Sequence, residues 1–369
     1  MATTDFGALS AAQKRVWSLR LFKAGRPASM LMSSNMIGTD ANSPVHLVTE
    51  LTKDERGDSC VMQLVQDLGG DGVVDDEMLE GNEEALVNEA VTIKLSQLRH
   101  GVKNRGRMSE QKTIIRFRST AREKLGFWFG DKLDELAFLV LSGVAFTLKL
   151  NGAPRSGGSQ LPLLQFAADV TAPTSNRQHF CGSATATANI TTADTLRWND
   201  VITMRTRAER SLVKPLRMKG KSYYILLMSP EAAGDLKKDD DYKTALSQAG
   251  NRGPGNGLFT GEFADIDGVL LYSAQKIKTT LGAASGSKFG ATGTVDGAQL
   301  LFLGAQALGY ARIGEPSWDE ADSTDYQNRA GIGHGQIVGF KKPVFTSIPD
   351  SGASADFGVI SSYCAARAA

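Results

Sequence analysis

The sequence lacks a net charge of either sign. Lys and Arg together number 41 and Asp and Glu number 40, which gives a formal net charge of +1 at pH 7. A protein whose main partner is nucleic acid usually carries a clear basic excess. We therefore expect any contact with a genome to be local, weak and non-specific. The 369 residues are enough for several packed units or one large irregular one.

Cysteines and long hydrophobic runs are also scarce. Cys60, Cys181 and Cys364 lie far apart in the sequence and form no CxxC pair, so we expect reduced thiols. The longest apolar run, around residues 136–144, is too short to span a bilayer. The first residues lack the apolar core and cleavage site of a signal peptide. We expect a chain that is made in the cytoplasm, stays soluble and has no membrane partner.

Motifs for catalysis and for metal binding are missing as well. Gly220-Lys221-Ser222 looks like the end of a phosphate loop, but Pro215 stands where that loop needs a glycine. The 4 histidines are isolated, and neither HExxH nor GxSxG occurs. The acidic clusters at 67–84 and 239–241 lack the alternating oxygen ligands of a calcium loop. We therefore expect no enzyme, no cofactor and no metal site.

Residues 57–100 predict a two-stranded β-hairpin with a long loop. The segment 59–65 is typical of a strand, and Val91, Ile93 and Leu95 alternate with polar residues as in a second strand. Between them lies a Gly-containing loop, 68–87. A two-stranded ribbon is marginal alone in water, and no nearby segment offers a third strand. We expect a neighbouring subunit to cover it.

Charge is strongly segregated around this hairpin. The loop is acidic and has no Lys or Arg, whereas the segment 99–124 is predominantly basic. The hairpin could fold back on its own helix, but a rod-like hairpin with its charge at the far end favours contact between subunits, where opposite patches fix register. The predicted interface comprises acidic residues Asp71, Asp75, Asp76, Glu80, Glu83 and Glu84, basic residues Arg105, Arg107, Arg116 and Arg118, and apolar residues Val73, Val74, Met78 and Leu79.

Residues 109–143 predict one long helix, because apolar residues recur there at spacings of three or four. Ser109 can cap its start and Gly143 can end it. At about 1.5 Å per residue, this helix would be on the order of 50 Å long. That length suits a spine against which strands pack.

The remaining segments are less regular. Residues 1–45 predict an arm with a short helix, whose basic residues indicate either a solvated face or an inner arm near packaged DNA. Residues 144–192 predict an irregular excursion, 194–210 a helix, and 220–350 an α+β unit without a βαβ repeat. The cluster 331–335 is expected to be a turn, and 336–340 and 358–360 late strands. The basic residues of the arm are Lys14, Arg15, Arg20, Lys23 and Arg26.

Several stretches together resemble the major capsid proteins of phage N-four-like and related tailed bacteriophages. They are DLGGDGVVDDEMLEGNEEAL at 67–86, RHGVKNRGRMSEQKT at 99–113, and then YYILLMSPEAAGDLKKD, LLFLGAQALGYA, GIGHGQIVGFKKPVF and DFGVI in that order. The likeness runs from about residue 17 to residue 360. Each piece alone is a weak signal, but the motif LEGNEE followed by a basic segment and a late GFKK is fairly specific.

The resemblance implies the α+β coat-protein fold shared by tailed phages and herpesvirus capsid floors. It implies an N-terminal arm at 1–45, an extended β-hairpin loop region at 46–104, a peripheral domain with the spine helix and a surface excursion at 105–219, an axial domain at 220–335, and strands returning to the peripheral domain at 336–369. It also implies a structural protein of the virion, made in the host bacterial cytoplasm, whose copies assemble as hexamers and pentamers into an icosahedral shell around double-stranded DNA.

The resemblance also sets expectations about partners. The loop tip contains no Lys, so we expect no covalent cross-link through it. The arm begins almost at Met1, so we expect a separate scaffolding protein, together with a portal and a decoration protein. Two other readings remain open: a genome-binding or portal-associated virion protein without shell formation, and a hydrolase that uses Asp239 to Asp241.

Overall fold

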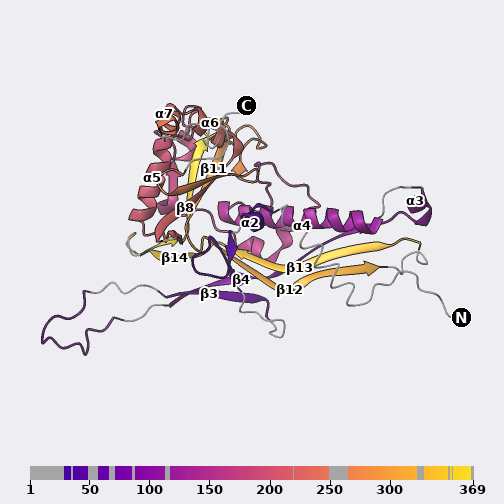
Figure 1. The fold of residues 1–369 in the computed structure, drawn as a ribbon, viewed down its shortest axis with the longest axis horizontal. Helices are drawn as coiled ribbons and strands as arrows, with labels where there is room; N and C mark the ends of the chain where they lie inside the picture. Colours follow the sequence, from indigo (N-terminus) through magenta and orange to yellow (C-terminus); the bar gives the residue numbers. More distant parts are fainter. Residues whose placement is uncertain are drawn as a thin grey trace.

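A long helix lies along an elongated sheet, and a second sheet with its own helices packs at one end of it (Figure 1). One hydrophobic cluster is continuous through both parts. The computed structural model describes residues 29–34, 36–48, 57–65, 71–84, 88–112, 117–218, 220–248, 265–321, 328–347, 350 and 352–366.

The spine is helix α4 (Phe117–Ser142), and a shorter helix, α3 (Arg107–Gln111), precedes it. The prediction of one helix over 109–143 is therefore corrected: Ser109 lies inside α3 and does not cap it, and α4 alone is about 39 Å long at about 1.5 Å per residue. Gly143 ends the helix as predicted, with φ +66°. A Cβ there would lie 2.5 Å from the Thr171 carbonyl oxygen, so only glycine fits.

The elongated sheet has five strands, and α4 packs against several of them, including β13, β5 and β12. β12 and β13 form a long antiparallel pair with an irregularity between Ile313 and Ser317. β5 follows the hairpin directly, so the expectation of no further strand near it was wrong, although β5 pairs with β13 and not with the hairpin. In spatial order the strands are β1 (Ile37–Gly38), β2 (Val45–Val48), β12 (Leu308–Ala321), β13 (Gly331–Lys341) and β5 (Ser96–Lys103).

The expected turn at 331–335 is also corrected, because these residues begin strand β13. Gly335 in this segment serves close packing instead of a change of direction. A Cβ on Gly335 would lie 2.6 Å from Cγ of Arg99 on the neighbouring strand β5. Glycine therefore marks a close backbone approach within a strand here.

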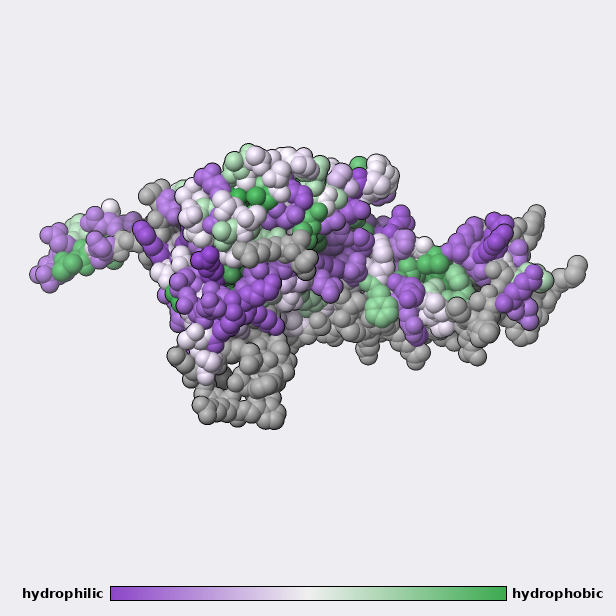
Figure 2. Space-filling view, turned by 90° about the horizontal axis from the view of Figure 1, so that it is seen from above, coloured by the Kyte–Doolittle hydropathy of each residue, from purple (hydrophilic) through white to green (hydrophobic). Residues whose placement is uncertain are grey.

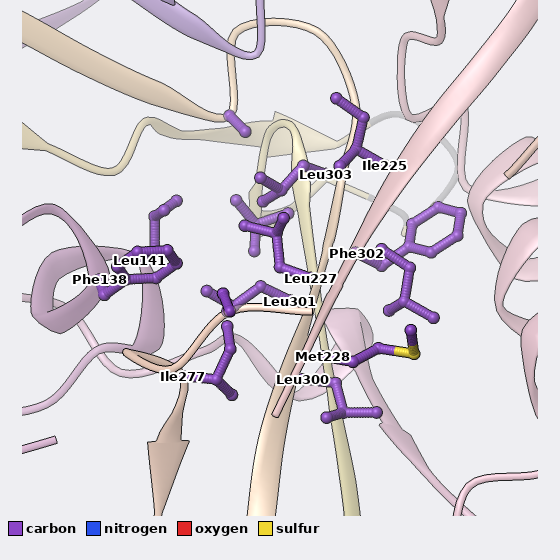
Figure 3. Packing of buried hydrophobic residues seen from close by; sticks show 14 of the residues in the cluster. Phe138, Leu141, Ile225, Leu227, Met228, Ile277, Leu300, Leu301, Phe302 and Leu303 are labelled. Carbon is purple, nitrogen blue, oxygen red and sulfur yellow. The ribbon is translucent and has the colours of Figure 1, made fainter. Parts of the chain in front are cut away.

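The second sheet has seven strands and contributes many residues to the main hydrophobic cluster. Every residue of β11 and β16 is buried, which is why both strands are mostly apolar, and the buried Gln299 donates a hydrogen bond to Ser361 across them. Figure 3 shows Leu227 and Leu301 pointing toward Phe138 and Leu141 of α4, while Phe302 lies on the other side of the sheet. The strands are β6 (Gln178–Phe180), β16 (Val359–Ala365), β11 (Gly297–Leu303), β8 (Lys221–Met228) and β7 (Leu216–Met218), with β9 (Val269–Ser273) beside β8 and β10 (Lys278–Thr279) beside β11.

Three helices accompany this sheet. The predicted helix at 194–210 is observed as α5 (Trp198–Arg210). β8 and β9 pair in parallel and are connected through α6 (Pro230–Lys238) and α7 (Asp240–Gln248), a single crossover that the sequence analysis did not anticipate. Ser229 caps α6, since its side chain accepts a hydrogen bond from the Ala232 amide. The predicted loop at 251–261 lies outside the described residues.

The late segments are divided between the two sheets. β12 and β13 belong to the elongated sheet, but β16 lies inside the seven-stranded sheet, between β6 and β11. β13 and β16 thus lie in different sheets, and the assignment of 336–369 to the peripheral domain stays a prediction. Between them, β14 (Val344–Ser347) and β15 (Ala353–Asp356) form a separate two-stranded pair.

The excursion at 144–192 is irregular, as predicted. Its regular parts are the three-residue strand β6 and short 3₁₀ turns, η2 (Leu161–Leu163), η3 (Gln165–Asp169), η4 (Ser175–Arg177) and η5 (Thr187–Asn189). Phe166 anchors η3 in the core, at 1% exposure.

The N-terminal segment is attached to the spine by a buried carboxylate. Asp134 of α4 accepts hydrogen bonds from the Ser29 hydroxyl at 2.6 Å and from the Met30 amide at 2.5 Å. Burial raises the pKa of Asp134, and these hydrogen bonds oppose that rise. The short helix α2 (Met30–Ser33) starts at this point. The predicted arm helix and its basic residues lie outside the described residues.

Candidate interaction surface

The hairpin forms as predicted, and its base packs on the chain's own sheet. β3 (Ser59–Val65) pairs with β4 (Asn88–Lys94), from Ser59 opposite Lys94 to Val65 opposite Asn88. Cys60 and Ile93 are buried in a cluster with Ala311 of β12. Lys94 also forms an ion pair with Asp169 at 3.0 Å. The base is therefore covered within the chain, which corrects, for the base, the expectation that a neighbouring subunit covers the ribbon.

The tip, residues 71–84, projects away from the rest of the molecule, at the far left in Figure 1. All of its predicted acidic residues are exposed. Its hydrogen bonds include two local ones, from the Gly81 amide to Glu83 at 2.7 Å and from the Asn82 side chain to the Met78 carbonyl at 2.9 Å. Asp75 adopts a positive φ of 54°, as does Gly72 at 74°. The tip is thus a chain of turns that presents its side chains outward.

Large apolar side chains are exposed among these carboxylates. Val74 is 68% exposed, Met78 70% and Leu79 61%, whereas Val73 is half-buried. In Figure 2 the tip is the protrusion at the left, where hydrophobic residues lie among hydrophilic ones. Scattered exposed leucines are ordinary in proteins, but several together on a projection indicate a contact surface.

The structure does not bring the four arginines of the predicted basic surface together at one place. Arg105 and Arg107 are exposed before and at the start of α3, next to Met108, which is 69% exposed. Arg118 instead forms an ion pair with Glu320 of β12 at 2.9 Å, so it is engaged within its own chain. Arg116 lies outside the described residues. The sequence analysis did not include Met108 in this surface. An apolar residue directly after Arg107 is the feature that could have indicated it.

The two surfaces lie at opposite ends of one molecule. Figure 1 shows the tip at the far left and α3 at the far right, with both sheets between them. The tip therefore does not reach Arg105 or Arg107 of the same chain, and the alternative in which the hairpin folds back on its own helix was wrong for these two residues. A contact between these charges requires two molecules.

One buried ion pair joins two of the late segments to each other, and a second pair joins them to η4 of the excursion. Lys342 and Asp356 pair at 2.9 Å with side-chain exposures of 1% and 0%. Burial lowers the pKa of Lys342 and raises that of Asp356, while the attraction between them opposes both shifts. Arg177 pairs with Asp350 at 2.8 Å nearby. These charges are enclosed and paired, as a structural network requires.

The three aspartates considered for a hydrolase site, Asp239 to Asp241, differ in their structural contacts. Asp240 and Asp241 are exposed in the first turn of α7, and Lys243 pairs with Asp240 at 3.0 Å. Asp239 accepts a hydrogen bond from the Trp198 amide, which places it at the start of α5. Among the helices that the structure describes, none is long and apolar enough to cross a membrane.

Comparison with known proteins decides the family. The profile of a family described as phage capsid protein matches residues 5–368. The chain belongs to the phage capsid protein family. It is 42% identical over 371 residues to the major capsid protein of Pseudomonas phage KPP25, and the match covers 98% of each chain.

Solved phage capsids share the fold of this capsid protein. The capsid of Ralstonia phage GP4 matches with a TM-score of 0.75 and 25% identity, covering 100% of this chain and 96% of that one. The capsid of cyanophage Pam1 matches with a TM-score of 0.72 and 22% identity, covering 99% of each chain. The α+β tailed-phage capsid fold and the family predicted from the sequence are therefore confirmed, and the chain is a structural subunit of a phage shell.

Proposed function

We propose that this chain is the major coat subunit whose copies close into an icosahedral shell around double-stranded DNA, and that the tip of one copy binds the α3 region of the next. The observation that carries this proposal is the placement of an exposed, acidic and partly apolar tip at one end of the molecule and exposed arginines at the other. Such a contact joins two different surfaces, so it repeats from copy to copy and generates rings. Hexamers and pentamers of this chain are the expected rings.

The energy of the contact divides between its apolar and charged parts. Val74, Met78 and Leu79 expose large apolar areas, and burying them would stabilise the contact by about 25 cal/mol per Å². Exposed ion pairs contribute only about 0–1 kcal/mol each and are screened by salt. Apolar burial therefore supplies most of the free energy, and Arg105 and Arg107 fix the register against the carboxylates of the tip.

The other parts of the chain have roles in the same proposal. The seven-stranded sheet with α5 to α7 corresponds to the axial part that meets its copies at the centre of a ring, and α4 with the elongated sheet to the peripheral part. The basic arm at residues 14–26 makes weak, non-specific contacts with packaged DNA. A scaffolding protein, a portal and a decoration protein are the expected partners, and the host cytoplasm is the site of synthesis.

Electron microscopy of the expressed chain tests this function. The full chain is produced in bacterial cells, alone and together with the scaffolding protein of the same phage, and purified particles are imaged by negative stain. Closed shells are the expected result. Open rings or DNA complexes without shells, in both preparations, would instead support a genome-binding or portal-associated protein.

A variant with two charges reversed tests whether shell formation depends on the proposed contact. Glu80→Lys with Glu83→Lys should reduce the yield of closed shells at least tenfold while the subunit stays folded by circular dichroism. The control reverses two exposed carboxylates outside the tip, Asp40→Lys with Asp265→Lys. Normal shells from the tip variant, or equal losses from both variants, would contradict the role of the tip.

A further inference from the structure

Three metal-ligating side chains meet in the part of the fold that has the least regular structure. His179 belongs to β6 and Cys181 follows it two residues later, while Asp200 lies in the first turn of α5. One ligand atom from each of the three, the imidazole nitrogen, the thiol sulfur and a carboxylate oxygen, lies within 4.8 Å of the other two. The proposed assembly contact uses none of these residues, so the cluster has no role in it.

The backbone explains why the two β-strand ligands point the same way. β6 pairs in parallel with β16, with His179 opposite Ser362. The Cys181 amide continues the ladder by donating to the Tyr363 carbonyl at 3.0 Å. Side chains two residues apart on a strand share a face. His179 and Cys181 are therefore side by side, and α5 brings Asp200 to that same face.

The ligand atoms are enclosed, and one of them lacks a hydrogen-bond partner. Cys181 is 0% exposed, His179 8% and Asp200 9%. Nε2 of His179 is buried without a hydrogen-bond partner, although Oδ1 of Asp200 lies 3.7 Å away. That separation is too long for a hydrogen bond. It is close to the roughly 3.4 Å that separates two ligand atoms placed about 2.1 Å from a tetrahedral ion.

We propose that His179, Cys181 and Asp200 bind one zinc ion, or a divalent ion of similar softness. Sulfur, imidazole and carboxylate together match zinc and do not match magnesium or calcium, which take oxygen ligands. A thiolate and a carboxylate supply two negative charges, so a divalent ion with a neutral imidazole gives a buried site without net charge. Binding releases the thiol proton of Cys181 and the extra proton of the His179 imidazolium to solvent, and no oxidation or reduction takes place.

The fourth ligand comes from β16 or from water. The Ser362 hydroxyl lies 3.5 Å from the Cys181 sulfur. The Cys364 thiol is also in hydrogen-bonding contact with Cys181 and points toward the Ala298 carbonyl at 3.8 Å. Either group would bring a further strand into the site. The metal would then connect β6, β16 and α5, and so fasten the end of the irregular excursion to the seven-stranded sheet.

Metal content and cobalt spectroscopy of the purified full chain test the site. Protein produced with zinc should retain about one zinc ion per chain by elemental mass spectrometry. Cobalt substitution should produce a sulfur-to-metal charge-transfer band in the near ultraviolet, and added zinc should abolish it. Zinc at background level, together with the absence of that band, would overturn the proposal without affecting the assembly contact.

Variants assign the ligands. Cys181→Ser and His179→Gln should each lower zinc affinity at least tenfold and weaken or remove the cobalt band. Cys60→Ser is the matched control, since Cys60 is a buried thiol in a different cluster, and it should keep both signals. If Cys181→Ser does not fold, the wild-type cobalt band still decides, because a band of that kind in the Cys60→Ser chain leaves only Cys181 and Cys364 as sulfur donors. Cys364→Ser then distinguishes these two, and a band that depends on Cys364 alone would contradict the proposed ligand set.

Discussion

At the residue scale, buried polar groups in the described part of the chain are sensitive to loss of a partner. His334 lies in β13 at 1% exposure, and its Nδ1 donates to the Ser317 carbonyl at 2.8 Å. Its ring meets that of Phe129 edge-on, with centroids 4.7 Å apart. Burial lowers the pKa of His334 below its ordinary value of 6.5, and the hydrogen bond to Ser317 opposes the shift. The imidazole is therefore neutral where α4 meets the elongated sheet.

This histidine makes the subunit less stable in acid. Below pH 6.5 the unfolded chain binds a proton at this position while the folded chain stays neutral until its lower pKa is reached. The free energy of unfolding should therefore fall as pH drops through this window, by up to about 1.4 kcal/mol per pH unit. Thermal unfolding of unassembled subunits between about pH 7.5 and pH 5 measures the slope. His334→Gln should flatten it and His100→Gln, at an exposed position on β5, should not.

The buried Lys342–Asp356 pair leads to a second expectation. Lys342→Met leaves Asp356 enclosed without its ammonium partner, and we expect a loss of about 3–5 kcal/mol in the free energy of unfolding. The matched control is Lys243→Met, whose partner Asp240 is 95% exposed. That change should cost about 0–1 kcal/mol. Chemical denaturation of both variants measures the difference, and equal losses would show that the buried pair has no special importance.

At the scale of elements, glycines in β13 determine how the hairpin sits. A Cβ on Gly339 would lie 2.4 Å from the Lys94 carbonyl oxygen at the end of β4. Gly339→Ala should therefore push the hairpin base off the sheet and destabilise the fold by about 1–3 kcal/mol. Gly333→Ala is the control on the same strand, because its nearest neighbour would be 3.8 Å away. That change should stay within about 0.5 kcal/mol, as equilibrium unfolding can verify.

The proposed contact makes the opposite prediction for the hairpin tip, which would then serve assembly and contribute little to folding. Leu79 is 61% exposed, so Leu79→Ser should change the free energy of unfolding by less than about 0.5 kcal/mol. Closed shells should nevertheless become several-fold rarer in negative-stain counts. Leu163→Ser removes a leucine that is 74% exposed and lies outside the tip. Equal shell yields from the two variants would remove the reason to assign Leu79 to a contact.

Elements differ in how far the sequence could predict them. The segment 59–65 was predicted with the bounds that the structure has, because a compact apolar run allows few other conformations. β6 was missed because three residues give no readable period. The glycines at 331–335 were taken for a turn because glycine usually marks one, and the need for close packing on β5 depends on a strand more than two hundred residues away.

The same limit applies to the sites. The acidic tip was predictable because its charges are consecutive and a long loop between two strands must be exposed. The partner of Arg118 was not, because Glu320 lies 202 residues further along the chain. Asp200 is much nearer to Cys181 in the sequence, but their spacing matches no familiar metal-ligand motif, and the start of α5 brings the two side chains together. The domain boundaries and the intersubunit roles of the charged residues stay predictions.

At the scale of the whole molecule, the separation of the two charged ends allows a test by exchange of charges. Arg105→Glu with Arg107→Glu should abolish shells, as should Glu80→Lys with Glu83→Lys. Combining all four changes in one chain should restore part of the shell yield, because opposite charges again face each other. The control Arg217→Glu reverses an exposed arginine on β7 and should assemble normally. If the fourfold variant forms no more shells than the double variants, although all of them stay folded, direct pairing of these residues would be contradicted.

If the projecting tip of one copy binds the arginines of the next, as proposed, the same two ends also set the course of assembly over time. A molecule with unlike ends that adds to another always leaves one further end unoccupied, so no small complex is complete until a ring closes. Growth from subunits should therefore show a lag and a threshold concentration, below which only monomers persist. Dimers that accumulate steadily without such a threshold would mean that the first step satisfies both ends at once.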